Sequence, residues 1–270
     1  MKNLCTNSFG LFVCMWLVTL CASQTEWDYF TLAQSWPPGN CIDAKREHHV
    51  CNTSHIDERI KTWTVHGLWP SAMGSKGPSF CDNTTKFNAT QINCLMDNLT
   101  IYWPNLYKDT NLTSLWQHEW LKHGTCCQDN KDTSGEFNYF AAALMLNQKY
   151  NITRMLMNHG VVPSTTVQYS IDDFVTAIKK EVGYTPVVNC AAKKMKNGTT
   201  YHLISQLEIC LSKDFTPRSC DSGYQPIRDE INELYNNDGH WWHHNWKNPP
   251  QSTCPKKYKF SYPPIHQTPE

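Results

Sequence analysis

The chain has no excess of charge of either sign and no long basic run. Its 24 Lys and Arg residues balance 24 Asp and Glu residues over 270 positions. Proteins that coat nucleic acid by bulk electrostatics neutralise many phosphates at once and need such an excess. We therefore exclude that class and expect any polyanionic ligand to be held at a local site.

Long apolar runs are also missing beyond the N-terminus. No stretch after residue 23 reaches the roughly 18 apolar residues of a membrane-spanning helix. Residues 1–23 instead have the features of a secretory signal, with an early Lys2, an apolar run from Phe9 to Leu20, and small residues at Ala22 and Ser23. We expect residues 1–23 to be removed, and residues 24–270 to form one domain without a membrane anchor.

No Cys-x-x-Cys pair occurs, which argues against a structural zinc site. Of the 13 cysteines, three lie in the expected signal and an even number, ten, follow it. This pattern is typical of disulfides formed in an oxidising compartment. We predict five disulfides and no metal or other cofactor. The cysteines concerned are Cys41, Cys51, Cys81, Cys94, Cys126, Cys127, Cys190, Cys210, Cys220 and Cys254.

Seven Asn-x-Ser/Thr acceptor sequences support the same compartment. Four of them fall between residues 83 and 111, so we expect that region to lie at the surface. The protein is expected to be secreted, with the lysosome as the alternative destination. The seven acceptors are Asn52, Asn83, Asn88, Asn98, Asn111, Asn151 and Asn197.

Internal repeats and long linkers are absent, and short strands precede and follow a helical middle. This order predicts an α+β fold, with a central sheet and helices beside it. A Ser170-x-x-Asp173 capping box predicts the start of one helix, which Gly183 would end. Strands are expected over 27–36, 61–69, 186–190, 201–211 and 258–264, a polar loop over 41–51, and helices over 91–103, 116–123, 135–150, 152–159 and 171–182.

Serine and cysteine nucleophile motifs are missing as well, whereas histidines gather in two segments. WQHEWLKHGTCC (116–127), if helical, makes His118 and Lys122 neighbours at i,i+4, and likewise Glu119 and His123. Gly124 would end this helix in a left-handed conformation. WTVHGLWP (63–70) adds His66 on a strand. We expect the two segments to face each other across one cleft.

Other histidines are not assigned a catalytic role. His48, His49 and His55 are interpreted as surface residues, and His159 and His202 as structural ones. A Trp- and His-rich segment, Asp238–Trp246, lies in an irregular C-terminal portion that begins at about residue 221. It is interpreted as an aromatic surface insertion, with a metal or base-stacking loop as the alternative.

Two imidazoles, a carboxylate and an ammonium suit proton transfer around an anion. The unperturbed pKa of histidine, about 6.5, allows one imidazole to be neutral while another is protonated in mildly acidic solution. Composition and spacing alone do not show which acid–base reaction of an anion such a site would catalyse. A metal-dependent phosphodiesterase remains an alternative at this point.

The two histidine segments resemble a known pair. WTVHGLWP and HEWLKHGTC resemble the two active-site segments of the ribonuclease T2 family, in the same order and about fifty residues apart. Further similarity covers 34–37, 206–210 and 262–264. The resemblance implies an antiparallel sheet with helices beside it. It also implies metal-independent cleavage of single-stranded RNA by transphosphorylation, which gives 2′,3′-cyclic and then 3′-phosphate ends.

The resemblance also assigns roles by position. His66 matches the general acid and His123 the general base, and these labels exchange when the cyclic product is hydrolysed. Glu119 and Lys122 match residues that stabilise the pentacovalent phosphorus. The two remaining matches bind substrate: His118 a phosphate, and Trp69 a base by stacking.

The same resemblance implies most of the disulfide pairing. The common family pairs are Cys41–Cys51, Cys81–Cys126, Cys190–Cys254 and Cys210–Cys220. We expect the remaining pair to be Cys94–Cys127, a bridge outside the common pattern.

Two positions depart from the family pattern. Ser71 stands where many members have aspartate, and Leu115 where many have phenylalanine. Both positions affect base recognition, so we predict no preferred nucleotide.

We expect a monomer that acts on RNA and not on DNA. A different class of function, a glycoprotein that works mainly by binding a receptor or lectin, is the alternative.

Overall fold

The computed structural model describes residues 26–46, 49–51, 56–75, 77–195, 198–220 and 254–266. The expected signal segment and Asp238–Trp246 lie outside these ranges, as do His48, His55 and the acceptors Asn52 and Asn197. The interpretations given for those residues therefore stay predictions.

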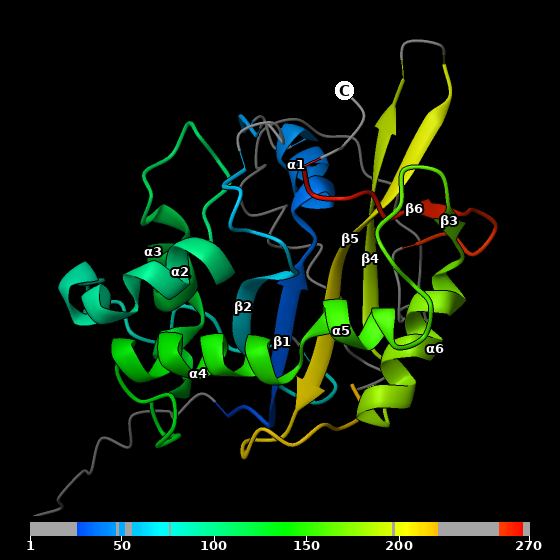
Figure 1. Ribbon diagram of the computed structural model, residues 1–270. Helices are drawn as coiled ribbons and strands as arrows, with labels where there is room; N and C mark the ends of the chain where they lie inside the picture. Colours follow the sequence, from blue (N-terminus) through cyan, green and yellow to red (C-terminus); the bar gives the residue numbers. More distant parts are fainter. Residues whose placement is uncertain are drawn as a thin grey trace, which may run out of the picture.

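A six-stranded sheet forms the centre of the molecule (Figure 1). Its order is β2-β1-β5-β6-β3, and β4 pairs with β5 outside that path. The long pairs are antiparallel, and only β5 and β6 run parallel among the strands described. The strands are β1 (Tyr29–Ser35), β2 (Thr64–Ser71), β3 (Gln168–Tyr169), β4 (Val187–Lys194), β5 (Thr200–Leu211) and β6 (Phe260–Ser261).

Helices flank this sheet near β2 and near β4. Figure 1 shows α2, α3 and α4 beside β2, and α6 beside β4. The predicted α+β class with an antiparallel central sheet is confirmed. The helices are α1 (Pro37–Arg46), α2 (Met96–Tyr102), α3 (Ser114–Lys122), α4 (Glu136–Lys149), α5 (Ile152–Met157) and α6 (Ile171–Val182), with 3-10 helices η2 (Ala89–Leu95) and η3 (Gly124–Cys127).

The predicted capping box at α6 is present. The Asp173 backbone N–H donates to the Ser170 hydroxyl, and the Ser170 N–H donates to the Asp173 carboxylate at 2.7 Å. Gly183 ends the helix with φ 84°, in the left-handed region that favours glycine. Local sequence alone fixes both ends of this helix.

Two local predictions were wrong. The segment after β1 forms helix α1 where a polar loop was expected, because Pro37 fits the first turn of a helix, where no backbone N–H is needed. Gly124 does not stop α3 with a positive φ, since the chain continues there into η3. A Cβ atom on Gly124 would lie 2.3 Å from the Trp120 ring, so this glycine permits close packing.

The core is rich in aromatic side chains that also carry hydrogen bonds. The Trp63 indole donates to the Tyr262 hydroxyl at 2.9 Å, and the Trp36 indole donates to the Pro263 carbonyl oxygen at 3.0 Å. Burial raises the pKa of the Tyr262 phenol. These contacts hold the C-terminal segment against the end of β1 and against Trp63, three residues before His66.

Four of the five expected disulfides are present. They are Cys41–Cys51, Cys81–Cys126, Cys190–Cys254 and Cys210–Cys220. The expected Cys94–Cys127 bridge is absent, and both residues are free thiols. Cys94 is exposed on η2, whose inward-facing residue is Ile92, whereas Cys127 is fully buried.

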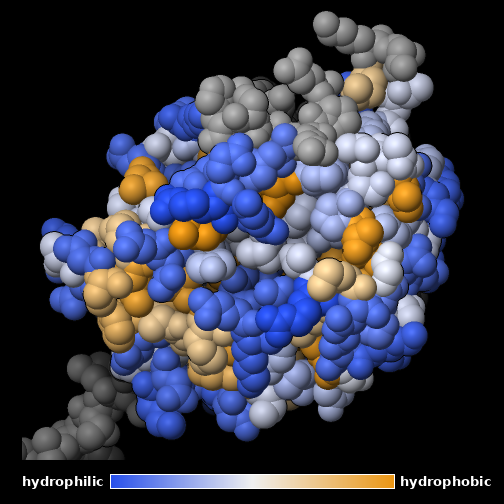
Figure 2. Space-filling model, in the orientation of Figure 1, coloured by the Kyte–Doolittle hydropathy of each residue, from blue (hydrophilic) through white to orange (hydrophobic). Residues whose placement is uncertain are grey.

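The surface carries the predicted acceptor cluster. Asn83, Asn88, Asn98 and Asn111 are all exposed, as expected for that region. Figure 2 shows hydrophilic residues over much of one face, with apolar residues in separate patches. Within the described ranges, every helix falls short of the length and hydropathy needed to cross a membrane.

Candidate active site

A β-bulge presents His66. β2 and β1 pair residue by residue until Ala33 opposes Gly67 and Gln34 opposes Val65, which leaves His66 as the extra residue of β2. Such a bulge re-aims a side chain, and it interrupts the strict alternation that the sequence predicted here. The His66 side chain is 30% exposed.

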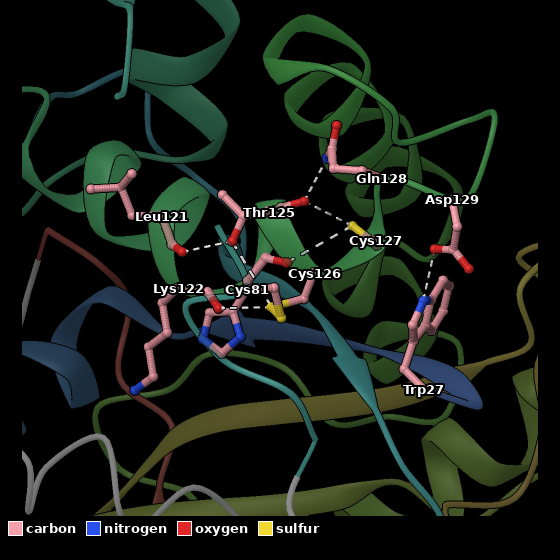
Figure 3. The surroundings of a disulfide bond; sticks show 11 residues. Trp27, Cys81, Leu121, Lys122, Thr125, Cys126, Cys127, Gln128 and Asp129 are labelled. Carbon is pink, nitrogen blue, oxygen red and sulfur yellow. Dashed lines mark hydrogen bonds between the residues drawn. A yellow bond between two sulfur atoms is a disulfide. The ribbon is translucent and has the colours of Figure 1, made fainter. Parts of the chain in front are cut away.

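Helix α3 presents the second histidine segment and is firmly held. Glu119, Lys122 and His123 are buried, and His118 is half-buried. The Trp116 indole donates to the Trp103 carbonyl oxygen at 2.7 Å. The Cys81–Cys126 disulfide fixes the end of the helix, and Figure 3 shows the Lys122 side chain extending away from it.

Tyr139 of α4 joins the two segments. Its hydroxyl donates to the Leu68 carbonyl oxygen at 3.0 Å and lies 3.4 Å from the Glu119 carbonyl oxygen. One buried phenol therefore contacts the backbone of both β2 and α3. These two contacts connect the strand to the helix.

The two segments meet at the Glu119 carboxylate. Its Oε2 accepts a hydrogen bond from the Trp69 indole at 2.8 Å, and its Oε1 lies 3.9 Å from Nε2 of His66. The Trp69 ring centroid is 5.2 Å from that of His66 and 5.5 Å from that of His123. The Trp69 ring thus contacts both imidazoles, and the expectation that the segments face each other agrees with this geometry.

Gly67 makes this approach possible. A Cβ atom there would lie 2.1 Å from the Trp69 indole nitrogen and 2.2 Å from the Glu119 carboxylate. No side chain other than hydrogen fits without displacing one of them. The glycine in the sequence signature is therefore explained by space, not by backbone conformation.

His118 and Lys122 border a different part of the site. The Lys122 carbonyl oxygen accepts the backbone N–H of Phe80 at 2.9 Å, and the Phe80 ring meets the His118 ring edge-on at 6.5 Å. Phe80 has φ 50°, an unusual value for an aromatic residue, and is 44% exposed. The sequence analysis did not single it out.

The surroundings of Trp69 bear on its expected stacking role, which stays a prediction. Its ring is only 2% exposed and its N–H is bound to Glu119, so the indole suits a positioning role better than base stacking. Ser71 is also buried, with its hydroxyl 2.9 Å from that of Thr31. Neither residue offers an open surface to a base here.

Three other histidines of the described ranges lie elsewhere. His49 contacts Asp109 at 2.9 Å, and His159 contacts Glu181 at 3.0 Å. His202 stacks on Tyr258 with ring centroids 4.3 Å apart. These contacts agree with their interpretation as surface or structural residues.

The fold and the site together have the form of an acid–base enzyme on an α+β scaffold. The Ribonuclease T2 family model matches residues 27–220. Ribonuclease Oy of Magallana gigas is 39% identical over 242 residues, which cover 89% of this chain and 98% of that protein. The chain belongs to the ribonuclease T2 family and is an endoribonuclease.

Solved structures agree with this assignment. An RNase-related protein from Calystegia sepium superposes with a TM-score of 0.63 at 28% identity, covering 88% of this chain and 98% of its own. RNase NT in complex with 5′-AMP gives a TM-score of 0.63 at 25% identity, covering 88% of this chain and 99% of its own.

Proposed function

We propose that this protein cleaves single-stranded RNA by transphosphorylation, with His66 and His123 as the acid–base pair. The observation that carries the proposal is the placement of two imidazoles around one buried carboxylate–indole pair. A phosphodiester needs two proton transfers at opposite oxygens, and two imidazoles differing by one proton supply both.

In the first step, neutral His123 takes the proton of the 2′-hydroxyl. The 2′-oxygen then bonds to the adjacent phosphorus, and the bond from phosphorus to the 5′-oxygen breaks. Protonated His66 gives the proton on Nε2 to that leaving oxygen. The products are a 2′,3′-cyclic phosphate and a 5′-hydroxyl.

In the second step the two histidines exchange roles. His66, now neutral, takes a proton from water, and the resulting hydroxide bonds to phosphorus. The bond from phosphorus to the 2′-oxygen breaks, and His123 returns its proton to that oxygen. The product is a 3′-phosphate.

Charge that develops on the phosphoryl oxygens is stabilised by Glu119, Lys122 and His118. Glu119 would act as a hydrogen-bonding carboxyl group, and Lys122 as the cation. The nucleophile is the 2′-hydroxyl, so DNA is not a substrate. The similar protein RNase NT forms a complex with 5′-AMP, which supports a nucleotide ligand for this site.

We further propose that the protein is a secreted, monomeric glycoprotein. The exposed acceptors at Asn83, Asn88, Asn98 and Asn111 support this proposal. They also favour the second candidate function, binding of a lectin or receptor through glycans. Enzymatic removal of the glycans separates the two, because RNA cleavage should persist while lectin binding is lost.

Two substitutions test the proposed chemistry. We expect His66→Phe and His123→Phe each to lose at least about a thousandfold in kcat, since each removes one of the two proton transfers. The melting temperature should change little for His66→Phe. Full activity in either folded variant would refute the pair. Activity that EDTA abolishes would favour the metal-dependent alternative.

A further inference from the structure

Gln206 of β5 lies directly behind His66. Its Oε1 is 2.5 Å from the Nδ1 atom of the imidazole, on the side of the ring away from the Nε2 atom that approaches Glu119. A second bulge helps to place it, because Asn189 pairs with Gln206 while Cys190 pairs with Ile204. Ser205 is the extra residue there, so His66 lies at one bulge of the sheet and Gln206 lies next to another.

The orientation of the Gln206 amide is determined by Glu208. The Gln206 Nε2 atom lies 2.8 Å from Oε1 of Glu208. An ionised carboxylate only accepts hydrogen bonds, so the amide nitrogen must face Glu208 and the amide oxygen must face His66. That oxygen accepts in turn, so the proton of the 2.5 Å contact is on Nδ1 of His66.

Glu208 is itself fixed in place. Its side chain is fully buried, and Oε1 also accepts from the Asn189 amide at 2.8 Å. Burying a carboxylate is costly, and this one is directed at a chain of polar groups that leads to the reaction centre. The chain has one polarity along its whole length: His66 donates to Gln206, and Gln206 and Asn189 donate to Glu208.

The titratable groups that face His66 come from α3, from the residue that ends it, and from β5. Glu119 of α3 lies 3.9 Å from its Nε2 atom, and Glu208 of β5 reaches it through Gln206. His123, after α3, lies against the same Trp69 ring that His66 contacts. Hydrogen bonds from Glu208 through Gln206 lead to the Nδ1 atom.

We propose that Gln206 and Glu208 are positioning residues that hold neutral His66 in the tautomer with its proton on Nδ1. This inference rests on the proposed function, in which His66 is an acid in the first step and a base in the second. When His66 donates from Nε2, the tautomer that remains carries its proton on Nδ1. Gln206 stabilises that product, and the electron pair on Nε2 stays directed at the substrate.

The tautomer matters only while His66 is neutral. In the first step the imidazole starts protonated on both nitrogens, and either tautomer gives the same cation. In the second step neutral His66 must accept a proton from water at Nε2. Loss of the Gln206 and Glu208 hydrogen bonds should therefore slow hydrolysis of the 2′,3′-cyclic phosphate more than it slows transphosphorylation.

Glu208→Gln and Gln206→Leu test this inference in the full-length enzyme. We expect each to lower kcat for a 2′,3′-cyclic nucleotide about tenfold or more, by analogy with the loss of a group that orients a metal-bound histidine. The rate of RNA transphosphorylation should fall much less, and KM should stay similar. Cyclic ends would then accumulate during RNA digestion.

A spectroscopic measurement gives an independent readout. The ¹⁵N chemical shifts of His66, recorded at a pH where the ring is neutral, report which nitrogen carries the proton. In the unmodified protein we expect Nδ1 to be protonated, and in Glu208→Gln a mixture of tautomers. Protonation of Nε2 in the unmodified protein would overturn the inference, whatever the variants do.

Exchanging the two side chains provides a rescue. In the double variant Gln206→Glu with Glu208→Gln, a carboxylate lies beside the imidazole and an amide donates to it from behind. That carboxylate can only accept a hydrogen bond, so His66 must again donate from Nδ1. The Nδ1–H tautomer and cyclic phosphate hydrolysis should therefore return. Glu136→Gln, a change at a buried carboxylate of α4 that accepts the Asn88 N–H, is the matched control and should leave both rates unchanged.

The outcomes separate this inference from the proposed function. If His66→Phe abolishes both steps while Glu208→Gln and Gln206→Leu leave the tautomer and the ratio of the two rates unchanged, only the positioning role fails. Equal losses in both steps without rescue by the exchange indicate a purely structural contribution, which also contradicts the inference. Full activity of His66→Phe would remove the function itself.

Discussion

The indole N–H of Trp69 donates a 2.8 Å hydrogen bond to Glu119, and both side chains are almost completely buried. This bond joins β2 to α3 next to the two candidate catalytic imidazoles. Trp69→Phe removes the donor from a buried carboxylate, which we expect to lower the free energy of unfolding by about 1–3 kcal/mol. It should also lower kcat, because Glu119 loses its orientation.

Denaturant unfolding and steady-state kinetics check this prediction. A Trp69→Phe enzyme with unchanged stability and kcat would contradict the positioning role. A change confined to KM would instead support the stacking role that the family resemblance implied.

Gly67 tests whether space limits the site. In Gly67→Ala the new methyl group would displace the Trp69 indole or the Glu119 carboxylate, each within 2.2 Å of it. We expect loss of most activity in a protein that still folds. Gly160→Ala is the matched control, because φ there is 76° and no atom lies within 4 Å. It should cost about 1 kcal/mol of stability through backbone strain and leave kcat unchanged. Equal activity in both variants would show that the close approach at Gly67 is not needed.

Phe80 is the exposed aromatic residue beside His118, and we predict that it stacks on a base of the substrate. Stacking of this kind contributes about 1–3 kcal/mol per base. Phe80→Ala should therefore raise KM for a dinucleotide substrate about tenfold while kcat changes less. Phe137→Ala, with 42% exposure on α4, is the control and should leave KM unchanged. An unchanged KM in Phe80→Ala would show that Phe80 does not stack on a base of the substrate.

The two free cysteines should differ sharply in reactivity. Burial raises the pKa of the Cys127 thiol to about 12, whereas Cys94 is exposed. Since thiolates are the reactive form, iodoacetamide should modify Cys94 in the native protein and Cys127 only after unfolding. Peptide mapping by mass spectrometry checks this. A peptide that contains both residues joined by a disulfide would restore the fifth bridge.

The contact between His49 and Asp109 gives a pH-dependent prediction. The His49 side chain and the Val50 N–H hold the pKa of Asp109 below its usual range. Because the folded-state pKa is lowered, the carboxylate stabilises the fold above the usual aspartate pKa of about 3.9, and this contribution is lost as the pH falls through the lowered value.

The Val50 amide proton reports this titration in NMR spectra. Its shift should follow a midpoint below that of an ordinary aspartate, and Asp109→Asn should abolish the change. A midpoint at or above the ordinary value would contradict the lowered pKa.

Much of the fold is encoded locally and was predictable. The capping box at Ser170 and the glycine at 183 define α6, and the alternating segment before Pro37 defines β1. Patterns of this kind act over a few residues, so a single sequence reveals them. The same holds for the two histidine segments, whose signatures fix which residues meet.

Other features depend on tertiary contacts and were not predictable. The bulge at His66 arises from pairing with β1, and the role of Gly124 depends on the Trp120 ring. Gln206 and Glu208 approach His66 from a strand 140 residues away in sequence. The prediction of a Cys94–Cys127 bridge was wrong for a similar reason. An even number of cysteines does not show which side of η2 faces the core.

The central claim is that the 2′-hydroxyl attacks phosphorus with His66 and His123 as the proton carriers. Digestion of an RNA of defined sequence, with a single 2′-deoxy nucleotide at one position, tests it most directly. Mass spectrometry of the products should show 2′,3′-cyclic and then 3′-phosphate ends at every cleaved position except after the 2′-deoxy nucleotide. Cleavage after the 2′-deoxy nucleotide, or products with 5′-phosphate ends, would contradict the claim.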